Sequence, residues 1–369
     1  MKNWYAKYLL PGFVFQSIVI GGGYGTGREM VEFFMSKGPL GGYLGMCISM
    51  VIWSLVMALG FEFARQKKLY DYRNFLKSLL GRGWVLFEFI FLSTMILVIA
   101  VLGSAAGELC QLWGMPKMTG IVLMFGAIGF LVFKGSSLIE RAFSVWSLVL
   151  YGAYICMIAV AFYKFGDRII SNASLSIDHA PWLKGGFQYA AYNLGILPAI
   201  LFVARHFETR KEAFVAGLLS GPLGMIPAIL MYTIMLGNYP AVLSEAVPAY
   251  SLINQFNMPL FLGIFQIILF GTFIETGTGL IHGFNERISG VYTEKKQIMP
   301  PLLRLAIGVS ILITAVFIAT AFGLIELIAK GYGYITWAFW IIFLLPLLIR
   351  GSLIVFRRNT HLETNTGTT

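Results

Sequence analysis

The residues with the clearest chemical potential interrupt an apolar run near the start of the chain, which reads SIVIGGGYGTGREMVEFF over residues 17–34. The run begins at Tyr8 like a membrane helix, yet five glycines fall in its middle and charged residues follow. Unwound backbone at membrane depth persists only against protein or a watery cavity, where its N–H groups attract anions and its carbonyls attract cations. The stretch therefore predicts a binding site made by backbone. The alternative is a close-packing face formed by Gly21 and Gly25.

A second apolar run, over residues 185–207, is also disrupted in its middle, at YNLGILP. Pro198 lacks an N–H and clashes with the preceding turn, while Asn193 can bond backbone groups that a break releases. A simple proline kink is the alternative. If both runs break, their unwound parts form one substrate site, for which we expect these residues: Gly21, Gly22, Gly23, Tyr24, Gly25, Thr26, Tyr192, Asn193 and Gly195.

Charged residues within apolar runs are the next candidates, because each costs about 2.5–3.5 kcal/mol at the bilayer centre. Arg28 and Glu29 directly follow the glycine-rich break, so we expect at least one of them to line the cavity or to close a cytoplasmic gate. Glu108 lies near the end of another apolar run. It either lines an entrance or reaches to the membrane surface.

A run of small and polar residues also interrupts the apolar segment that starts near Pro259. On a helix, Thr272 and Thr276 share a face, since they are four residues apart, and Glu275 lies beside them. These side chains predict a cluster of oxygen ligands. The alternative is that the hydroxyls bond to carbonyls of their own helix.

Composition gives the class of protein that must position these residues. Hydrophobic residues make up 58% of the 369 and charged residues only 12%, against roughly 25% in soluble domains. Apolar stretches of about 20 residues, enough to cross a bilayer, recur along the chain. The chain is therefore expected to be an all-α membrane protein. Its net charge of +10 follows from basic loops and requires no nucleic-acid partner.

We expect ten transmembrane segments, starting near residues 8, 40, 84, 118, 143, 186, 213, 259, 302 and 333. Their spacing repeats after the fifth, and an odd number of crossings per half makes the repeat inverted, as in many secondary transporters. The expected organisation is a first five-helix repeat over 1–165, an extracellular loop over 166–185, a second repeat over 186–350 and a cytoplasmic polar tail over 351–369. The first helix of each repeat, helices 1 and 6, is expected to be broken.

Lys and Arg predict the orientation in the membrane. Most of them lie in loops that fall on one side if the N-terminus is inside, for example over residues 65–82. Cytoplasmic loops carry such an excess. Both termini are therefore expected in the cytoplasm of a multi-pass cell-membrane protein.

The stretch GGGYGTGRE, followed by Phe33 and Phe34, is similar to the G-x-G-[FY]-x-[ST]-G-x-E…FF signature of the YkvI-like membrane proteins. Together with two inverted sets of five helices, it resembles the LeuT-type fold of the amino acid–polyamine–cation superfamily. The resemblance covers about residues 5–350.

The resemblance implies that helix 8 lies against the break of helix 1 and that hydroxyls there help to hold sodium. The implied sodium ligands are Gly21, Tyr24, Thr272 and Thr276. Glu275 either adds charge to that site or carries a proton in its place. Sodium is thus a possible coupling ion, with the proton as the alternative, and no other cofactor is expected.

The expected function is a cation-coupled symporter of a small polar metabolite, such as an amino acid or a related carboxylate. The alternatives are a proton-coupled carrier, a uniporter or channel for an amine or nucleobase, and a membrane sensor. Neither metal-ligand spacing nor a nucleophile or phosphate-binding motif is found, so an enzyme is not expected. The expected partners are the small-molecule substrate and the lipid bilayer.

Overall fold

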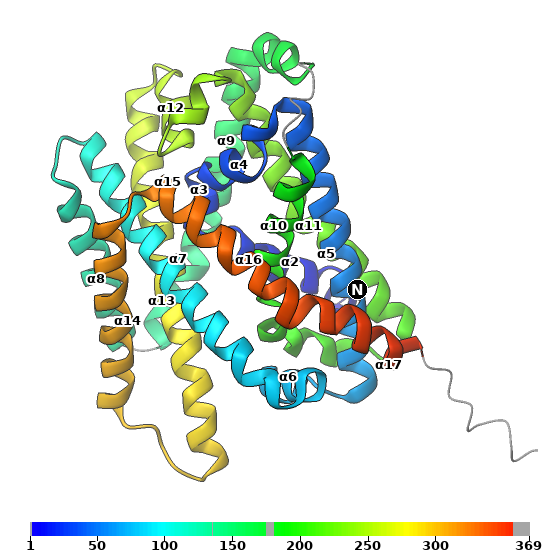
Figure 1. Cartoon of the computed structure of the whole chain (residues 1–369). Helices are drawn as coiled ribbons and strands as arrows, with labels where there is room; N and C mark the ends of the chain where they lie inside the picture. Colours follow the sequence, from blue (N-terminus) through cyan, green and yellow to red (C-terminus); the bar gives the residue numbers. More distant parts are fainter. Residues whose placement is uncertain (1, 135, 175–180, 357–369) are drawn as a thin grey trace, which may run out of the picture.

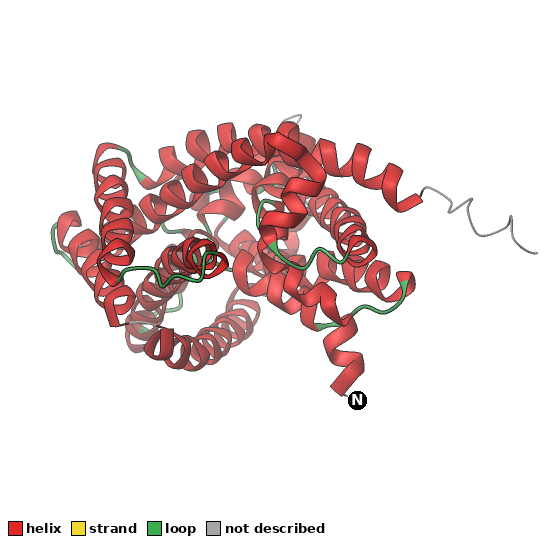
Figure 2. Cartoon of the chain, turned by 90° about the horizontal axis from the view of Figure 1, so that it is seen from below, coloured by secondary structure: helices red, strands yellow, loops and turns green. Residues whose placement is uncertain are grey.

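The computed structural model describes residues 2–134, 136–174 and 181–356, and within these ranges the chain forms helices and loops without a β-strand (Figure 2). Large apolar side chains cover much of the outer surface; Phe89, Tyr163 and Leu260 are largely exposed. Contiguous exposed apolar surface is unfavourable in water and favourable in hydrocarbon. The chain is accordingly an all-α membrane protein.

The first apolar run does not form one continuous helix. It is divided into α1 (Lys2–Tyr8), α2 (Leu10–Val19), α3 (Gly22–Gly25) and α4 (Arg28–Phe33), with the short helix η1 (Met35–Lys37) after them. Between α3 and α4, Gly27 has a φ of +79°, a left-handed conformation that favours glycine. In α1, Lys7 donates to Glu212 Oε1 at 2.9 Å, and this bond raises the pKa of Lys7.

The remaining helices before residue 174 are α5 (Pro39–Lys67), α6 (Tyr72–Leu80), η2 (Gly81–Gly83), α7 (Trp84–Leu112), α8 (Lys117–Lys134) and α9 (Ser136–Ala173). The short α6 starts where the Asp71 carboxylate accepts from the Asn74 backbone N–H, a typical N-cap. The long α9 is bent at Phe165, whose backbone is not helical.

The helices after residue 181 are α10 (Trp182–Leu194), η3 (Leu197–His206), α11 (Arg210–Met235), η4 (Leu236–Asn238), η5 (Ala241–Ser244), α12 (Pro248–Asn254), α13 (Pro259–Glu294), α14 (Pro301–Ala321), α15 (Leu324–Glu326), η6 (Leu327–Tyr332), α16 (Gly333–Phe339), η7 (Trp340–Leu344), η8 (Leu347–Gly351) and α17 (Ser352–Phe356). The axes of α10 and η3 differ by 65°. Pro198 lies in the first turn of η3, where it needs no N–H partner.

Six helices in the described part of the chain are long and apolar enough to cross a membrane, or seven if the bent pair α10–η3 is one span. Two further apolar helices, over Leu10–Val19 and Lys117–Phe133, are shorter, and α9 lies partly among residues whose side chains are not described. Each of the ten expected segments starts in one of these helices or beside one. The number of ten crossings itself stays a prediction.

The expected loop over 166–185 differs from what the structure describes. Helix α9 continues to Ala173 and α10 begins at Trp182, while residues 175–180 lie outside the described part. The low hydropathy of this stretch came from polar side chains on the last turns of α9, which do not prevent a helix. Similarly, α17 extends five residues into the expected tail, whose residues 357–369 lie outside the description.

The two expected repeats interlock and do not form separate bodies. Helix α5 packs against both α10 and α11. Ser49 Oγ donates to the Gly186 carbonyl at 2.7 Å and Trp53 Nε1 donates to the Ala190 carbonyl at 3.2 Å. In Figure 1, α5 and α11 lie at one edge, α8 and α14 lie at the opposite edge, and α3 and α10 lie between them. The interrupted segments are thus enclosed by packed helices.

Candidate substrate cavity

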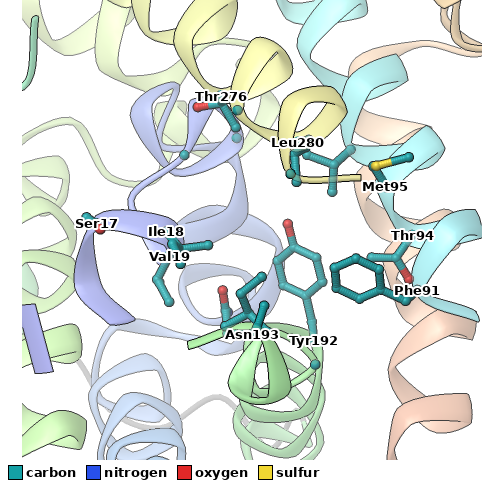
Figure 3. A pocket seen from close by; sticks show the side chains of 18 of the residues that line it. Ser17, Ile18, Val19, Phe91, Thr94, Met95, Tyr192, Asn193, Thr276 and Leu280 are labelled. Carbon is teal, nitrogen blue, oxygen red and sulfur yellow. The ribbon is translucent and has the colours of Figure 1, made fainter. Parts of the chain in front are cut away.

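A cavity of about 610 Å³ lies where the interrupted first run meets the bent pair. Much of its wall comes from α2, α7, α10 and α13 (Figure 3), and α4, α6, α9 and η6 also contribute lining residues. Its volume is within the 300–1,000 Å³ typical of small-molecule sites. The expected site residues that line it are Gly21, Gly23, Glu29, Tyr192, Asn193, Gly195, Glu275 and Thr276.

Local hydrogen bonds hold the backbone at the first break. The carbonyl of Gly21 accepts from Gly25 N, and that of Tyr24 accepts from Gly27 N, both at 2.9 Å. The Thr26 hydroxyl donates to the Gly23 carbonyl at 2.7 Å and accepts from Arg28 N at 3.1 Å. The carbonyls of Gly25 and Thr26 also accept hydrogen bonds, from the Tyr154 hydroxyl and from Ala249 N. The break is therefore less open than the sequence predicts, because these carbonyls already have protein partners. Thr26 is buried outside the cavity lining, and its hydroxyl bonds to backbone groups of the break.

The expected contact between the first break and α13 is present. A Cβ placed on Gly21 would lie 3.4 Å from Thr276 Cγ2 and 3.8 Å from its hydroxyl oxygen. Thr276 and Glu275 line the cavity, and Figure 3 shows Thr276 beside the unwound segment. Thr272 is buried outside the lining and its hydroxyl bonds to the Ile268 carbonyl at 2.9 Å. The structure thus places one of the two hydroxyls at the cavity and uses the other within its own helix.

Arg28 lies away from the cavity, although it is next to Glu29 in sequence. Its guanidinium donates to the carbonyls of Leu243 and Glu245, at 2.8 and 3.0 Å, and to Glu32 at 3.1 Å. Residues 243 and 245 precede α12, which lies at the opposite end of the molecule from α6 (Figure 1). With the expected orientation this end faces outward, so Arg28 does not fit the cytoplasmic gate that the sequence suggested. It holds the loop before α12 to α4.

Glu29 is buried like Arg28, but it differs in its position at the cavity and in its lack of partners among the described residues. Its side chain lines the cavity, is only 3% exposed and has no hydrogen bond or ion pair with another described residue. A Cβ on Gly23 would overlap with Glu29 Oε1, so glycine at that position leaves the room that the carboxylate occupies. The sequence placed Glu29 at the cavity but could not distinguish its environment from that of Arg28.

Glu108 lies outside the cavity and pairs with Lys117, with 2.7 Å between Nζ and Oε1. The pair joins the end of α7 to the start of α8. Lys117 is half exposed, so this contact resembles a surface ion pair, and Glu108 does not reach the lining residues.

Aromatic side chains form much of the wall. Tyr192 stacks on Tyr332 with 4.3 Å between ring centroids and 20° between planes. Tyr192 and Phe91 both point into the space in Figure 3. Tyr24 is fully buried, lies outside the lining and has a hydroxyl without a hydrogen-bond partner among the described residues.

Sequence reasoning missed several lining residues, chiefly Tyr332, Phe91 and Arg287. Arg287 Nη2 lies 2.5 Å from Glu88 Oε2, and its guanidinium carbon lies 3.7 Å from the centre of the Tyr72 ring. A cation directly after the polar run of α13 was a usable signal. Aromatic residues such as Phe91 gave none, because the chain contains 31 phenylalanines and 17 tyrosines.

Acidic, histidine and cysteine side chains nowhere gather in groups of three that could hold a metal ion, among the described residues. The polar side chains that line the cavity are the carboxyl groups of Glu29 and Glu275, the Asn193 amide, the Arg287 guanidinium and the hydroxyls of Ser17, Thr94, Thr276 and several tyrosines.

Comparison with known proteins shows which sequences and structures this chain resembles. No family model matches the chain. The chain is similar to the uncharacterized membrane protein YkvI of Bacillus subtilis strain 168, with 25% identity over 336 residues that cover 89% of this chain and 92% of that protein. This similarity confirms the resemblance to YkvI-like proteins.

Solved structures resemble the chain over nearly its whole length. MhsT in complex with L-phenylalanine has a TM-score of 0.62 at 15% identity, covering 95% of this chain and 98% of MhsT. A manganese transporter of Eremococcus coleocola has a TM-score of 0.61 at 15% identity, covering 92% and 77%. A Na+-coupled sialic acid symporter has a TM-score of 0.51 at 13% identity, covering 96% and 89%. Two of these are named as a transporter and a symporter, in agreement with the expectation that the chain is not an enzyme. At such identities the likeness establishes the fold: this membrane protein has the LeuT-type fold.

Proposed function

We propose that the protein is a secondary transporter that carries a small polar metabolite, such as an amino acid or a related compound, across the cell membrane by alternating access. One observation carries the proposal: a single cavity of about 610 Å³ is lined by both interrupted segments, through Gly21 and Gly23 on one and Asn193 and Gly195 on the other. Ten crossings in two inverted repeats, with helices 1 and 6 broken, would let one repeat rock against the other around this site.

Coupling to sodium is the second part of the proposal. The contact between Gly21 and Thr276, with Glu275 also at the cavity, supports a cation between the first break and α13. Gly21 and Tyr24 carbonyls each accept one hydrogen bond, and a carbonyl oxygen has a second lone pair for a cation. Glu275 carrying a proton is the alternative mode of coupling.

Uptake into proteoliposomes at constant pH tests this coupling. An imposed inward sodium gradient is expected to drive accumulation, and Thr276→Val to weaken the sodium dependence. The matched control is Thr320→Val, because Thr320 is an exposed threonine on α14 that bonds only to its own helix. Uptake that ignores sodium, follows a proton gradient and is lost in Glu275→Gln would replace sodium by the proton.

Counterflow distinguishes a carrier from a channel. Vesicles loaded with unlabelled substrate should transiently accumulate labelled substrate above the outside concentration if the protein is a carrier. The initial screen uses amino acids, organic acids, amines and nucleobases. Simple equilibration of every solute that crosses would contradict alternating access.

A further inference from the structure

Glu29 is a buried carboxylate without a counter-charge, which sets it apart from the other acidic side chains that the structure pairs. The ion pairs among the described residues are Glu32–Arg28, Glu62–Arg65, Glu88–Arg287, Glu108–Lys117, Glu208–Lys7, Glu212–Lys7, Glu286–Arg304 and Glu326–Lys330. Glu29 is more deeply buried than nearly all of these, at 3% exposure. An ionised carboxylate is costly in such a place unless a cation or hydrogen-bond donors compensate it. The carboxyl group is therefore either protonated or compensated by a cation that enters the cavity.

The basic residues nearest to this site are already committed. Arg28 bonds to two backbone carbonyls and to Glu32. Arg287 lines the cavity but holds Glu88 and stacks on Tyr72. Neither guanidinium therefore neutralises Glu29. The charged side chains among the described lining residues are Glu29, Glu275 and Arg287, and Arg287 already pairs with Glu88. This balance favours a cation over an anion on the side of the cavity that Glu29 lines, whereas Arg287 keeps one buried donor, Nη1, without a hydrogen-bond partner among the described residues.

The aromatic rings around Glu29 favour the same kind of ligand. Tyr192 and Tyr332 form a stacked pair that lines the same cavity as Glu29. Phe91 and Tyr151 add two further rings to the lining. An ammonium group over the face of an aromatic ring gains about 0.5–2 kcal/mol, with the larger value where water is excluded.

The position of the carboxylate is fixed by its neighbours and is not an accident of a flexible side chain. Glu29 is the second residue of α4. Its Oε1 occupies the space beside Gly23 that a Cβ on residue 23 would fill. Both residues line the cavity. The acid is thus held at the edge of the first break, where the proposed substrate binds.

We propose that the cavity recognises a protonated amine, with the ammonium group of the substrate bound to the Glu29 carboxylate and flanked by the Tyr192 and Tyr332 rings. This inference rests on the proposed function, because it names the charged group of the transported substrate. A metabolite that offers only a carboxylate does not bind there; an amino acid binds through its ammonium end.

Matched ligands of opposite charge test the inference on the purified full-length protein. The probes are butylamine and phenethylamine, their carboxylate counterparts pentanoate and 3-phenylpropionate, and the quaternary cation choline. At least one of the cations is expected to raise the unfolding temperature and to give a measurable titration by calorimetry, whereas neither carboxylate does. Stabilisation by a carboxylate, or by no cation of the panel, overturns the proposal.

Substitutions locate the binding group. Glu29→Gln is expected to weaken amine binding roughly 10- to 100-fold, the range for loss of one charged hydrogen bond. Gly23→Ala keeps the acid but displaces it and should weaken binding in the same direction. It also serves as a second variant if Glu29→Gln fails to fold. Glu326→Gln is the control, because Glu326 lies outside the cavity and pairs with Lys330. Unchanged amine affinity in Glu29→Gln or Gly23→Ala rules out this site.

Transport and binding can fail separately. If counterflow shows a carried anion or neutral solute while no amine binds, the inference is wrong and the transporter proposal stands. If amines bind at Glu29 but no solute shows counterflow, the site stands and the transporter proposal is wrong.

Discussion

At the scale of single residues, neighbours in the sequence have opposite tasks. The Thr26 hydroxyl bonds to the backbone of the break. Arg28 donates to a loop more than 200 residues away in the sequence, whereas Glu29 lines the cavity. On a short helix, adjacent side chains point about 100° apart, so Arg28 and Glu29 cannot share one environment. The sequence predicts that polar groups gather here. It does not predict the partner of each, because Leu243 and Glu245 are brought to Arg28 only by the folded loop.

We expect Arg28→Ala to destabilise the protein by about 3 kcal/mol, because it removes the charged hydrogen bonds from a buried guanidinium to two backbone carbonyls. The measurement is thermal unfolding of the purified protein. Arg304→Ala is the matched control, since Arg304 pairs with the half-exposed Glu286 and such pairs contribute about 0–1 kcal/mol. Equal shifts of the unfolding temperature in the two variants would show that Arg28 is not an anchor.

At the scale of helices, the long elements were predictable and the short ones were not. Apolar runs of about 20 residues identify helices such as α5, α7 and α14 without further information. The short helices α1, α6 and α12 lie at the surface with mixed polarity, and their caps gave a weaker signal. The break in the first run was predictable from its glycines. The hydrogen bonds that its carbonyls accept were not predictable, because they depend on the local turn in which the Thr26 hydroxyl takes part.

Small residues decide how closely α5 and α11 approach. A Cβ on Gly217 of α11 would overlap with backbone atoms of Met57 and Ala58 in α5. We therefore expect Gly217→Ala to lower the unfolding temperature, because a helix backbone must move to make room. Gly126→Ala in α8 is the control, since nothing lies within 4 Å of the added methyl. There alanine should be neutral or stabilising by about 0.5–1 kcal/mol. A Gly217→Ala variant as stable as Gly126→Ala would contradict the packing.

At the scale of the whole molecule, the cavity lies nearer to one end of the fold than to the other. Its walls include Tyr72 of α6 and Arg287 near the same end, whereas Arg28 and the loop before α12 close the opposite end. With the expected orientation, the closed end is outside and the cavity belongs to the cytoplasmic half. The repeat in the sequence predicted the fold that encloses the cavity. Which end of the cavity is closed could not be predicted, because it depends on contacts between residues far apart in the sequence, such as Arg28 and the loop before α12.

The orientation itself is the last prediction. The segment 65–82 contains α6, and its basic residues are Arg65, Lys67, Lys68, Arg73, Lys77 and Arg82. Cytoplasmic loops hold such an excess of basic residues. The end of the molecule that contains α12 lies opposite α6 (Figure 1). A reporter fused at the C-terminus should therefore be active in the cytoplasm, and one inserted within 166–185 should report the outside. If both report the same side, an odd number of crossings does not separate them and the inverted repeat is wrong; if both are reversed, the cavity belongs to the outer half.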